Sequence, residues 1–401
     1  MITVEQAREA LGLSRWTDYQ LEAFQVWESP DSTGAQRQRF CVYYPTGKGK
    51  TMTMMTLLAL RGYAEALIIT PPTVAGDWHE AGRRLGIETT TMSHAKFRMK
   101  DTRVSRQVPV IVDEFHLLGG HTADGWTKFD KLAEVLKAPV IIGSATPSYN
   151  DAERVYCIAH VLDPWGNRGG FLSWLYTHCT IAHNPHSATP FVTGFHKYDG
   201  APEFLSAMEN VVYLPDEAPD ILQDLHMGMD LPDEFERFNL DRSRGRIMAS
   251  SMEIRQRTRY LQIVNTATNR PHDHVYDMLG QIAGEATKPI LVFTARATVG
   301  KALASSLADN KVAYGYVDGS TSPKRKEQTI SAFRDGDLDI LVGTASIATG
   351  TDGLDKVADV LVILDDTDDA SLRRQLVGRV LPRGTDPDYT GKVAYRFMYN
   401  P

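Results

Sequence analysis

Short runs of consecutive apolar residues recur along most of the chain and alternate with stretches of helical periodicity. Such unbroken runs are typical of strands that are buried on both faces of a parallel sheet. In the first half of the chain they predict strands at 40–44, 66–70, 108–112 and 140–143. In the second half they predict strands at 290–294, 313–317, 339–343, 360–364 and 392–398.

Two series of strands and helices predict an α/β protein with two doubly wound parallel-sheet lobes. Parallel strands joined by helices must cross over, nearly always with the right hand, and each series should therefore fold as one unit. We expect a first lobe at 1–185, a linker with a helical protrusion at 186–270, and a second lobe at 271–401. A length of 401 residues also favours two domains over one.

Composition limits the classes of protein that the chain represents. No run approaches the roughly 18 apolar residues that span a bilayer, and no secretory leader is evident. We therefore expect a cytoplasmic or nucleoid-associated protein that does not bind a membrane. Cys41, Cys157 and Cys179 are odd in number and lack CxxC spacing, which favours a reducing compartment. A formal net charge of −7 argues against coating nucleic acid, although basic residues cluster at 83–84, 98–106, 242–259 and 324–326.

A glycine-rich loop follows the first predicted strand and precedes an apolar helical run. The loop reads Thr46-Gly47-Lys48-Gly49-Lys50-Thr51. Glycines let backbone N–H groups surround an anion, Lys50 can reach the β and γ phosphates, and the Thr51 hydroxyl can ligate Mg²⁺. The pattern therefore predicts a site for ATP and Mg²⁺.

Two adjacent acids end the strand predicted at 108–112. Asp113 at the strand tip can hold Mg²⁺, and Glu114 beside it can orient and deprotonate an attacking water. Together with the phosphate loop, this pair predicts hydrolysis of ATP.

These motifs resemble those of superfamily 2 helicases and translocases, which have two RecA-like lobes. The family's second motif, DE-x-H, is matched by Asp113-Glu114-Phe115-His116, and its third by Ser144-Ala145-Thr146-Pro147. The resemblance implies that Gln20 reads adenine, that His116, Ser144, Thr146 and Thr344 couple ATP to the nucleic acid, and that Ser93 and His94 occupy a strand-contacting motif. It further implies nucleotide-site roles for Gly350, Asp352 and Gln375.

The sixth motif of the family supplies an arginine from the second lobe to the γ-phosphate. Gln375 to Arg379 match its start, and Arg379 is the expected arginine finger. The family pattern has a second arginine where this chain has Pro382, with Arg383 one residue later. Arg383 can serve only if the proline reshapes the turn.

Within the superfamily the chain is most similar to Swi/Snf-like translocases of double-stranded DNA. Asp318-Gly319-Ser320-Thr321 is the most specific of the matching segments. The resemblance implies a DNA-stimulated ATPase that moves along duplex DNA by opening and closing the cleft between its lobes. RNA is the less expected partner.

Other readings of the sequence remain. A strand-separating helicase acting on forked or branched DNA or on RNA uses the same motifs, and the displaced arginine is compatible with an ATP-gated clamp that does not move. A metabolic P-loop kinase would have no use for the second lobe. Cysteines and histidines between Cys157 and His186 lack the paired spacing of a structural zinc site.

Overall fold

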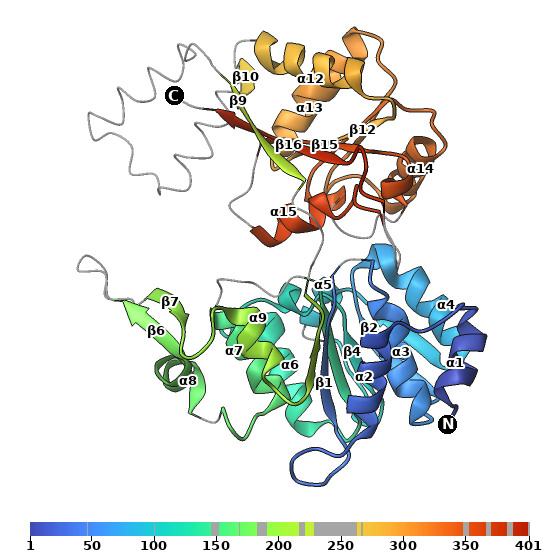
Figure 1. Ribbon diagram of the computed structural model, residues 1–401, viewed down its shortest axis with the longest axis vertical. Coiled ribbons are helices and arrows are strands. Elements are labelled where there is room, and N and C mark those ends of the chain that lie inside the picture. The colour runs from blue at the N-terminus through green and yellow to red at the C-terminus, as the bar shows by residue number, and fades with distance from the viewer. Residues whose placement is uncertain are drawn as a thin grey trace. The chain divides into compact units, whose positions relative to one another are not determined.

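The computed structural model describes residues 1–45, 47–99, 101–145, 152–167, 169–182, 191–215, 221–227, 263–265, 268–347, 353–365, 370–382 and 388–399. The chain divides into two compact units, Met1–Glu217 and Ala218–Pro401. Each unit contains one six-stranded sheet (Figure 1). Among the described helices, none has the length and apolar character needed to cross a membrane.

The sheet of the first unit has the strand order β3-β2-β4-β5-β1-β8, and its described pairings are all parallel. The strands are β1 (Arg39–Tyr43), β2 (Glu65–Ile69), β3 (Glu88–Met92), β4 (Val110–Val112), β5 (Val140–Ser144) and β8 (Val211–Tyr213). Alternate residues of β1 enter different cores, since Phe40 and Val42 pack on one face and Cys41 and Tyr43 on the other. Burial on both faces explains why the central strands are continuously apolar.

Helices cover both faces of this sheet (Figure 1). One face carries α1 (Val4–Leu11), α2 (Asp18–Glu28), α3 (Lys50–Leu60) and α4 (Ala75–Leu85). The other carries α5 (His94–Arg98), α6 (Asp124–Val135), α7 (Ala152–Leu162), α8 (Gly170–His178) and α9 (Ala201–Ser206), with the antiparallel pair β6 (Cys179–Ala182) and β7 (Phe191–Phe195).

The second unit repeats this plan with the strand order β13-β14-β12-β15-β16-β9, again in parallel. Its strands are β9 (Leu222–Met227), β12 (Ile290–Thr294), β13 (Tyr314–Val317), β14 (Ile340–Gly343), β15 (Val360–Asp365) and β16 (Val393–Tyr399). A short antiparallel pair, β10 (Val264–Asn265) and β11 (Arg270–Pro271), precedes the helix that begins at Asp273. One core contains residues of α12 (Asp273–Glu285) and α13 (Ala297–Asp309), and the other contains residues of α14 (Pro323–Arg334) and α15 (Ala370–Val377).

Two parallel sheets with helices on both faces confirm the predicted α/β class, and each predicted strand overlaps an observed one. The range 186–270 differs from the linker that the sequence suggested. Within it, β8 pairs with β1 of the first sheet and β9 pairs with β16 of the second. Both are edge strands, whose shorter or more polar sequences carry a weak apolar signal. The helical protrusion predicted in this range falls mostly on residues 228–262, which lie outside the described residues.

Candidate active site

Three neighbouring strands of the first sheet bring the predicted motifs to one edge. β4, β5 and β1 are adjacent in the strand order and parallel, so their carboxyl ends meet on the same side of the sheet. Asp113 follows β4, Ser144 ends β5, and the glycine-rich loop follows β1. Ligands of open α/β sheets bind at such carboxyl ends.

The glycine-rich loop is a tight turn between β1 and α3. Gly47 and Gly49 have φ angles of +80° and +76°, a conformation that costs a residue with a side chain about 1–2 kcal/mol. Helix α3 begins at Lys50 with Gly49 as its N-cap. The amides of its first turn therefore adjoin the loop, an arrangement that favours an anion. Lys50 Nζ lies 3.4 Å from the Tyr44 carbonyl oxygen; Thr46 lies outside the described residues.

Gln20 contacts this loop through its side chain. The residue is only 6% exposed, and its Oε1 accepts hydrogen bonds from the Thr17 backbone N–H (3.1 Å) and hydroxyl (2.9 Å). Its Nε2 donates to Thr53 Oγ1 of α3 at 3.2 Å. A Cβ atom added at Gly49 would lie 2.7 Å from this Nε2. Gln20 thus joins α2 to the phosphate loop, and its reading of adenine stays a prediction.

Asp113 is a buried carboxylate with two hydrogen-bond donors. Thr70 Oγ1 donates to its Oδ2 at 3.1 Å, and the Glu114 backbone N–H donates to its Oδ1 at 3.0 Å. Burial, and then the charge of Glu114, raises the pKa of Asp113 to about 6, although Lys50 and the two hydrogen bonds act in the opposite direction. Lys50 and Asp113 therefore interact electrostatically at this edge of the sheet. The contribution of Thr70, which the sequence analysis missed, has only one signal in the sequence: a threonine that ends an apolar strand.

Glu114 has an unusual backbone conformation, with φ 47° and ψ 55°. Few non-glycine residues adopt this left-handed region, and they cluster at functional sites. Its carboxylate Oε2 lies 3.4 Å from both His116 Nδ1 and Ser144 Oγ, and these two atoms are 3.1 Å apart. The structure thus brings together three residues that the sequence assigned to hydrolysis and coupling.

The position of His94 differs from the predicted contact with a nucleic-acid strand. Its side chain is 6% exposed, and its Nε2 lies 2.9 Å from the Asp113 backbone carbonyl oxygen. A carbonyl can only accept, so Nε2 carries the proton. Burial lowers the pKa of His94 to about 4, so the ring is neutral at pH 7. The Ser93 hydroxyl caps α5 by accepting from the Lys96 N–H at 3.1 Å.

In the second unit, the predicted Gln375 and Arg379 are both buried, at 6% exposure each; Gln375 lies in the last turn of α15, and Arg379 follows two residues after its end. Lys326 is also buried and donates to the Ser346 carbonyl oxygen. Burial, and then the charge of Arg379, lowers the pKa of Lys326. Lys326 therefore belongs to the surroundings of Arg379 rather than to an exposed basic track.

Two further predicted segments of the second unit follow the neighbouring strands β13 and β14. Thr344, which follows β14, is 9% exposed and donates its N–H to the Val317 carbonyl oxygen at 3.2 Å. Asp318 accepts hydrogen bonds from the Ser320 hydroxyl (2.6 Å), the Ser320 N–H (2.9 Å) and the Thr321 hydroxyl (3.2 Å), which hold its pKa well below the usual range. Thr146, Gly350, Asp352 and Arg383 lie outside the described residues.

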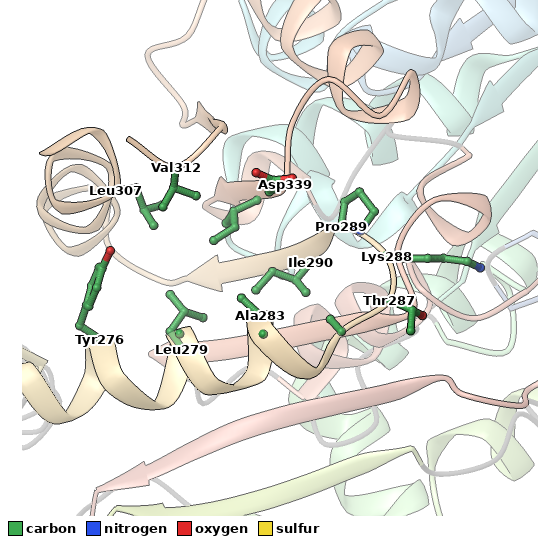
Figure 2. A pocket seen from close by; sticks show the side chains of 14 residues that line it. Tyr276, Leu279, Ala283, Thr287, Lys288, Pro289, Ile290, Leu307, Val312 and Asp339 are labelled. Atoms are coloured by element: carbon green, nitrogen blue, oxygen red, sulfur yellow. The ribbon is translucent and has the colours of Figure 1, made fainter. Parts of the chain in front are cut away.

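A groove of about 470 Å³ in the second unit lies apart from these motifs (Figure 2). Its lining includes Leu279 and Ala283 of α12 and the first residues of β12 and β14, Ile290 and Ile340. The groove is thus at the amino ends of the strands, opposite the edge where such sheets bind nucleotides.

The part of the chain that the structure describes contains no cluster of three side chains suited to a metal such as zinc. Cys157 and Cys179 are buried, and His160 Nε2 pairs with Asp130 at 3.3 Å. His183 and His186 lie outside the described residues.

Comparison with known proteins identifies the second unit and the fold. Residues 273–384 match the family described as the helicase conserved C-terminal domain. No curated protein matches the sequence of the chain. Among solved structures, Dbp5 of S. cerevisiae bound to RNA and ADP BeF3 is 14% identical with a TM-score of 0.58, covering 100% of this chain and 88% of that one.

Two archaeal structures show lower overall similarity. The SWI2/SNF2 ATPase core of Sulfolobus solfataricus in complex with dsDNA is 15% identical with a TM-score of 0.40, covering 96% of this chain and 88% of that one. The Hef helicase domain of Pyrococcus furiosus is 13% identical with a TM-score of 0.47, covering 98% and 96%.

The segment that matches the helicase C-terminal domain contains Thr344, Gln375 and Arg379, and the likeness to Dbp5 shows a shared fold. Residues 273–384 are thus similar to the helicase conserved C-terminal domain, and the chain shares its fold with the Dbp5 structure.

Proposed function

We propose that the chain hydrolyses ATP to translocate along duplex DNA. The observation that carries the proposal is the meeting of the phosphate loop, the Asp113-Glu114 pair and Ser144 at the carboxyl ends of β1, β4 and β5. The preference for duplex DNA rests on the sequence resemblance of Asp318 to Thr321 and the segment around Gln20 to Swi/Snf-like translocases.

In the proposed reaction, the amides at the start of α3 and the Lys50 ammonium bind the phosphates. Glu114 accepts the proton of the attacking water, and its carboxylate is oriented by Ser144 and His116, both at 3.4 Å. Because Ser144 and His116 also contact each other, movement of either segment changes the position of the general base. This contact is the proposed link between hydrolysis and the nucleic-acid track.

Mg²⁺ is the proposed metal, held by the Thr51 hydroxyl and the Asp113 carboxylate. Both are oxygen ligands of the kind that Mg²⁺ prefers. Asp113 is buried beside a second carboxylate, that of Glu114. Lys50 offsets the negative charge of Asp113 only in part, since the pKa of Asp113 is still raised to about 6. A cation at this carboxylate fits that unbalanced charge, and when bound it would screen the phosphate charge.

Arg379 is the proposed arginine finger, which stabilises charge on the γ-phosphate as the reaction proceeds. Its support is the match of the surrounding segment to the helicase C-terminal domain and the second buried cation, Lys326, beside it.

The hydrolysis step is tested by Glu114→Gln, which keeps the shape of the side chain but cannot accept the proton. We expect turnover to fall at least about 10²-fold, with ATP binding retained. Glu65→Gln is the matched control, because Glu65 is exposed at the amino end of β2. Nucleic-acid-stimulated hydrolysis that persists in Glu114→Gln at the control's rate would refute the assignment of the base.

The choice of track is tested by ATPase stimulation with duplex DNA, single-stranded DNA and RNA, followed by displacement of a third strand from a DNA triplex. A duplex translocase is stimulated most by duplex DNA and removes the third strand. Stimulation by RNA or by forks, with strand separation, would identify an unwinding helicase instead. Duplex binding that leaves the triplex intact would identify a clamp.

A further inference from the structure

The short helix α5 contacts the catalytic turn at both ends of that turn. At its start, His94 Nε2 donates to the Asp113 backbone carbonyl oxygen at 2.9 Å. At its end, the Arg98 guanidinium donates to the Leu117 backbone carbonyl oxygen. The segment between these two carbonyls contains Glu114 and His116. Helix α5 therefore braces the turn that presents the proposed general base.

The hydrogen bond from His94 fixes the peptide that joins Asp113 to Glu114. The Asp113 N–H donates to the Ile69 carbonyl oxygen at 2.9 Å, so the other side of Asp113 is anchored by β2. With the Asp113 carbonyl also held, this peptide plane cannot rotate without breaking a buried hydrogen bond. Rotation of that plane is the simplest way for Glu114 to leave its left-handed conformation, with φ 47°.

We infer that His94 is a positioning residue, whose Nε2–H donor holds the Asp113–Glu114 peptide so that the Glu114 carboxylate faces the reacting water. The inference rests on the proposed role of Glu114 as the base. His94 itself touches neither ATP nor the nucleic acid in this assignment. We therefore assign His94 this positioning role in place of the strand contact that the sequence predicted.

Four substitutions test the donor separately from the packing. The amide Nε2 of glutamine lies at nearly the distance from Cα of a histidine Nε2, so His94→Gln keeps the donor. His94→Asn carries its amide nitrogen too close to the backbone to reach the carbonyl. His94→Phe keeps a ring of similar size with no donor. His79→Phe is the matched control, since His79 is an exposed histidine that bonds Thr89 and Thr91 hydroxyls of the edge strand β3.

For each variant we would measure kcat and KM for ATP, with and without duplex DNA, together with DNA affinity and thermal unfolding. Misplacing a catalytic group by a fraction of an ångström to 1 Å can lower the rate about 10- to 100-fold. We expect kcat losses in that range for His94→Phe and His94→Asn, with KM for ATP and DNA affinity changed less than about threefold. His94→Gln should regain most of the rate, and His79→Phe should match the wild type.

Three results would overturn the inference. The first is a His94→Phe variant that is folded and keeps the wild-type kcat. The second is a folded His94→Gln variant as slow as His94→Phe, because packing alone would then explain the loss. The third is a loss confined to DNA affinity, which would return His94 to the strand contact. If DNA does not stimulate the wild type, the proposed track fails, while the ratio of basal kcat values still tests His94.

Discussion

Gly49 combines a left-handed backbone with a close approach to a buried side chain, so Gly49→Ala should affect both stability and nucleotide binding. The new Cβ would lie 2.7 Å from Gln20 Nε2, well inside contact distance. Gln20 is 6% exposed and held by Thr17 and Thr53, so it cannot move away without losing a hydrogen bond. The change should therefore cost more than the backbone conformation alone.

Gly86 provides the control that separates these two costs. It has a similar φ of +71° at the end of α4, and a Cβ added there meets nothing within 4 Å. The left-handed conformation costs about 1–2 kcal/mol, of which about 0.4–1 kcal/mol is offset by the stiffer unfolded chain, so Gly86→Ala should lose about 1 kcal/mol. Displacing the Gln20 amide adds about 1–2 kcal/mol in Gly49→Ala.

Thermal unfolding distinguishes the two variants, since about 1 kcal/mol corresponds to about 2–4 °C for a unit of this size. Gly49→Ala should melt several degrees below Gly86→Ala and should also raise KM for ATP. In a Gln20→Ala background the extra loss should disappear, because the contact no longer exists. Equal melting temperatures for the two glycine variants, or an extra loss that persists without Gln20, would refute the reasoning.

Three other substitutions test the environment of the site and its support. The raised pKa of Asp113 means that the folded chain binds a proton more tightly than the unfolded chain does, so stability falls as pH rises from about 4 to about 6. Asp113→Asn should therefore be more stable than the wild type by about 1–3 kcal/mol at pH 8, and this difference should vanish near pH 4. A variant that is destabilised at pH 8 would contradict this. Thr70→Val removes a hydrogen bond that favours the charged carboxylate, so the acid limb of the pH–rate profile should move to higher pH; an unmoved limb would show that Asp113 does not control it. Gly82→Ala places a Cβ 2.7 Å from the Ile87 carbonyl oxygen and 2.5 Å from Thr89 Cγ2, so the free energy of unfolding measured in urea should fall by about 2 kcal/mol. A rise in that free energy would mean that α4 and β3 separate easily.

The sequence predicts the central strands well because their burial is repeated at every residue. In β12, for example, Ile290 and Val292 enter one core, and Leu291 and Phe293 enter the other. The edge strand β3 escaped prediction because its sequence, Glu88–Met92, is partly exposed and rich in threonine. Strand β9 at the edge of the second sheet contains Asp224 and His226 for the same reason.

The phosphate loop and the acid pair could also be predicted, since their requirements are local. Gly47 and Gly49 must be glycine because of their own backbone angles. The hydrogen bond from His94 could not be predicted, because its acceptor is a backbone carbonyl 19 residues away. Every residue has a backbone carbonyl, so the sequence does not indicate which one accepts this hydrogen bond.

Stability and turnover should respond differently at the two kinds of residue that form this site. Asp113 and Glu114 are held in unfavourable states, one by burial of its charge and one by its backbone. Substituting Asp113 relieves that cost, so stability should rise while hydrolysis is lost. His94 instead belongs to the surroundings that hold the backbone next to Glu114, and removing its contact should lower turnover without any gain in stability. The sign of the stability change therefore separates a residue that takes part in the reaction from a residue that only positions a reacting group.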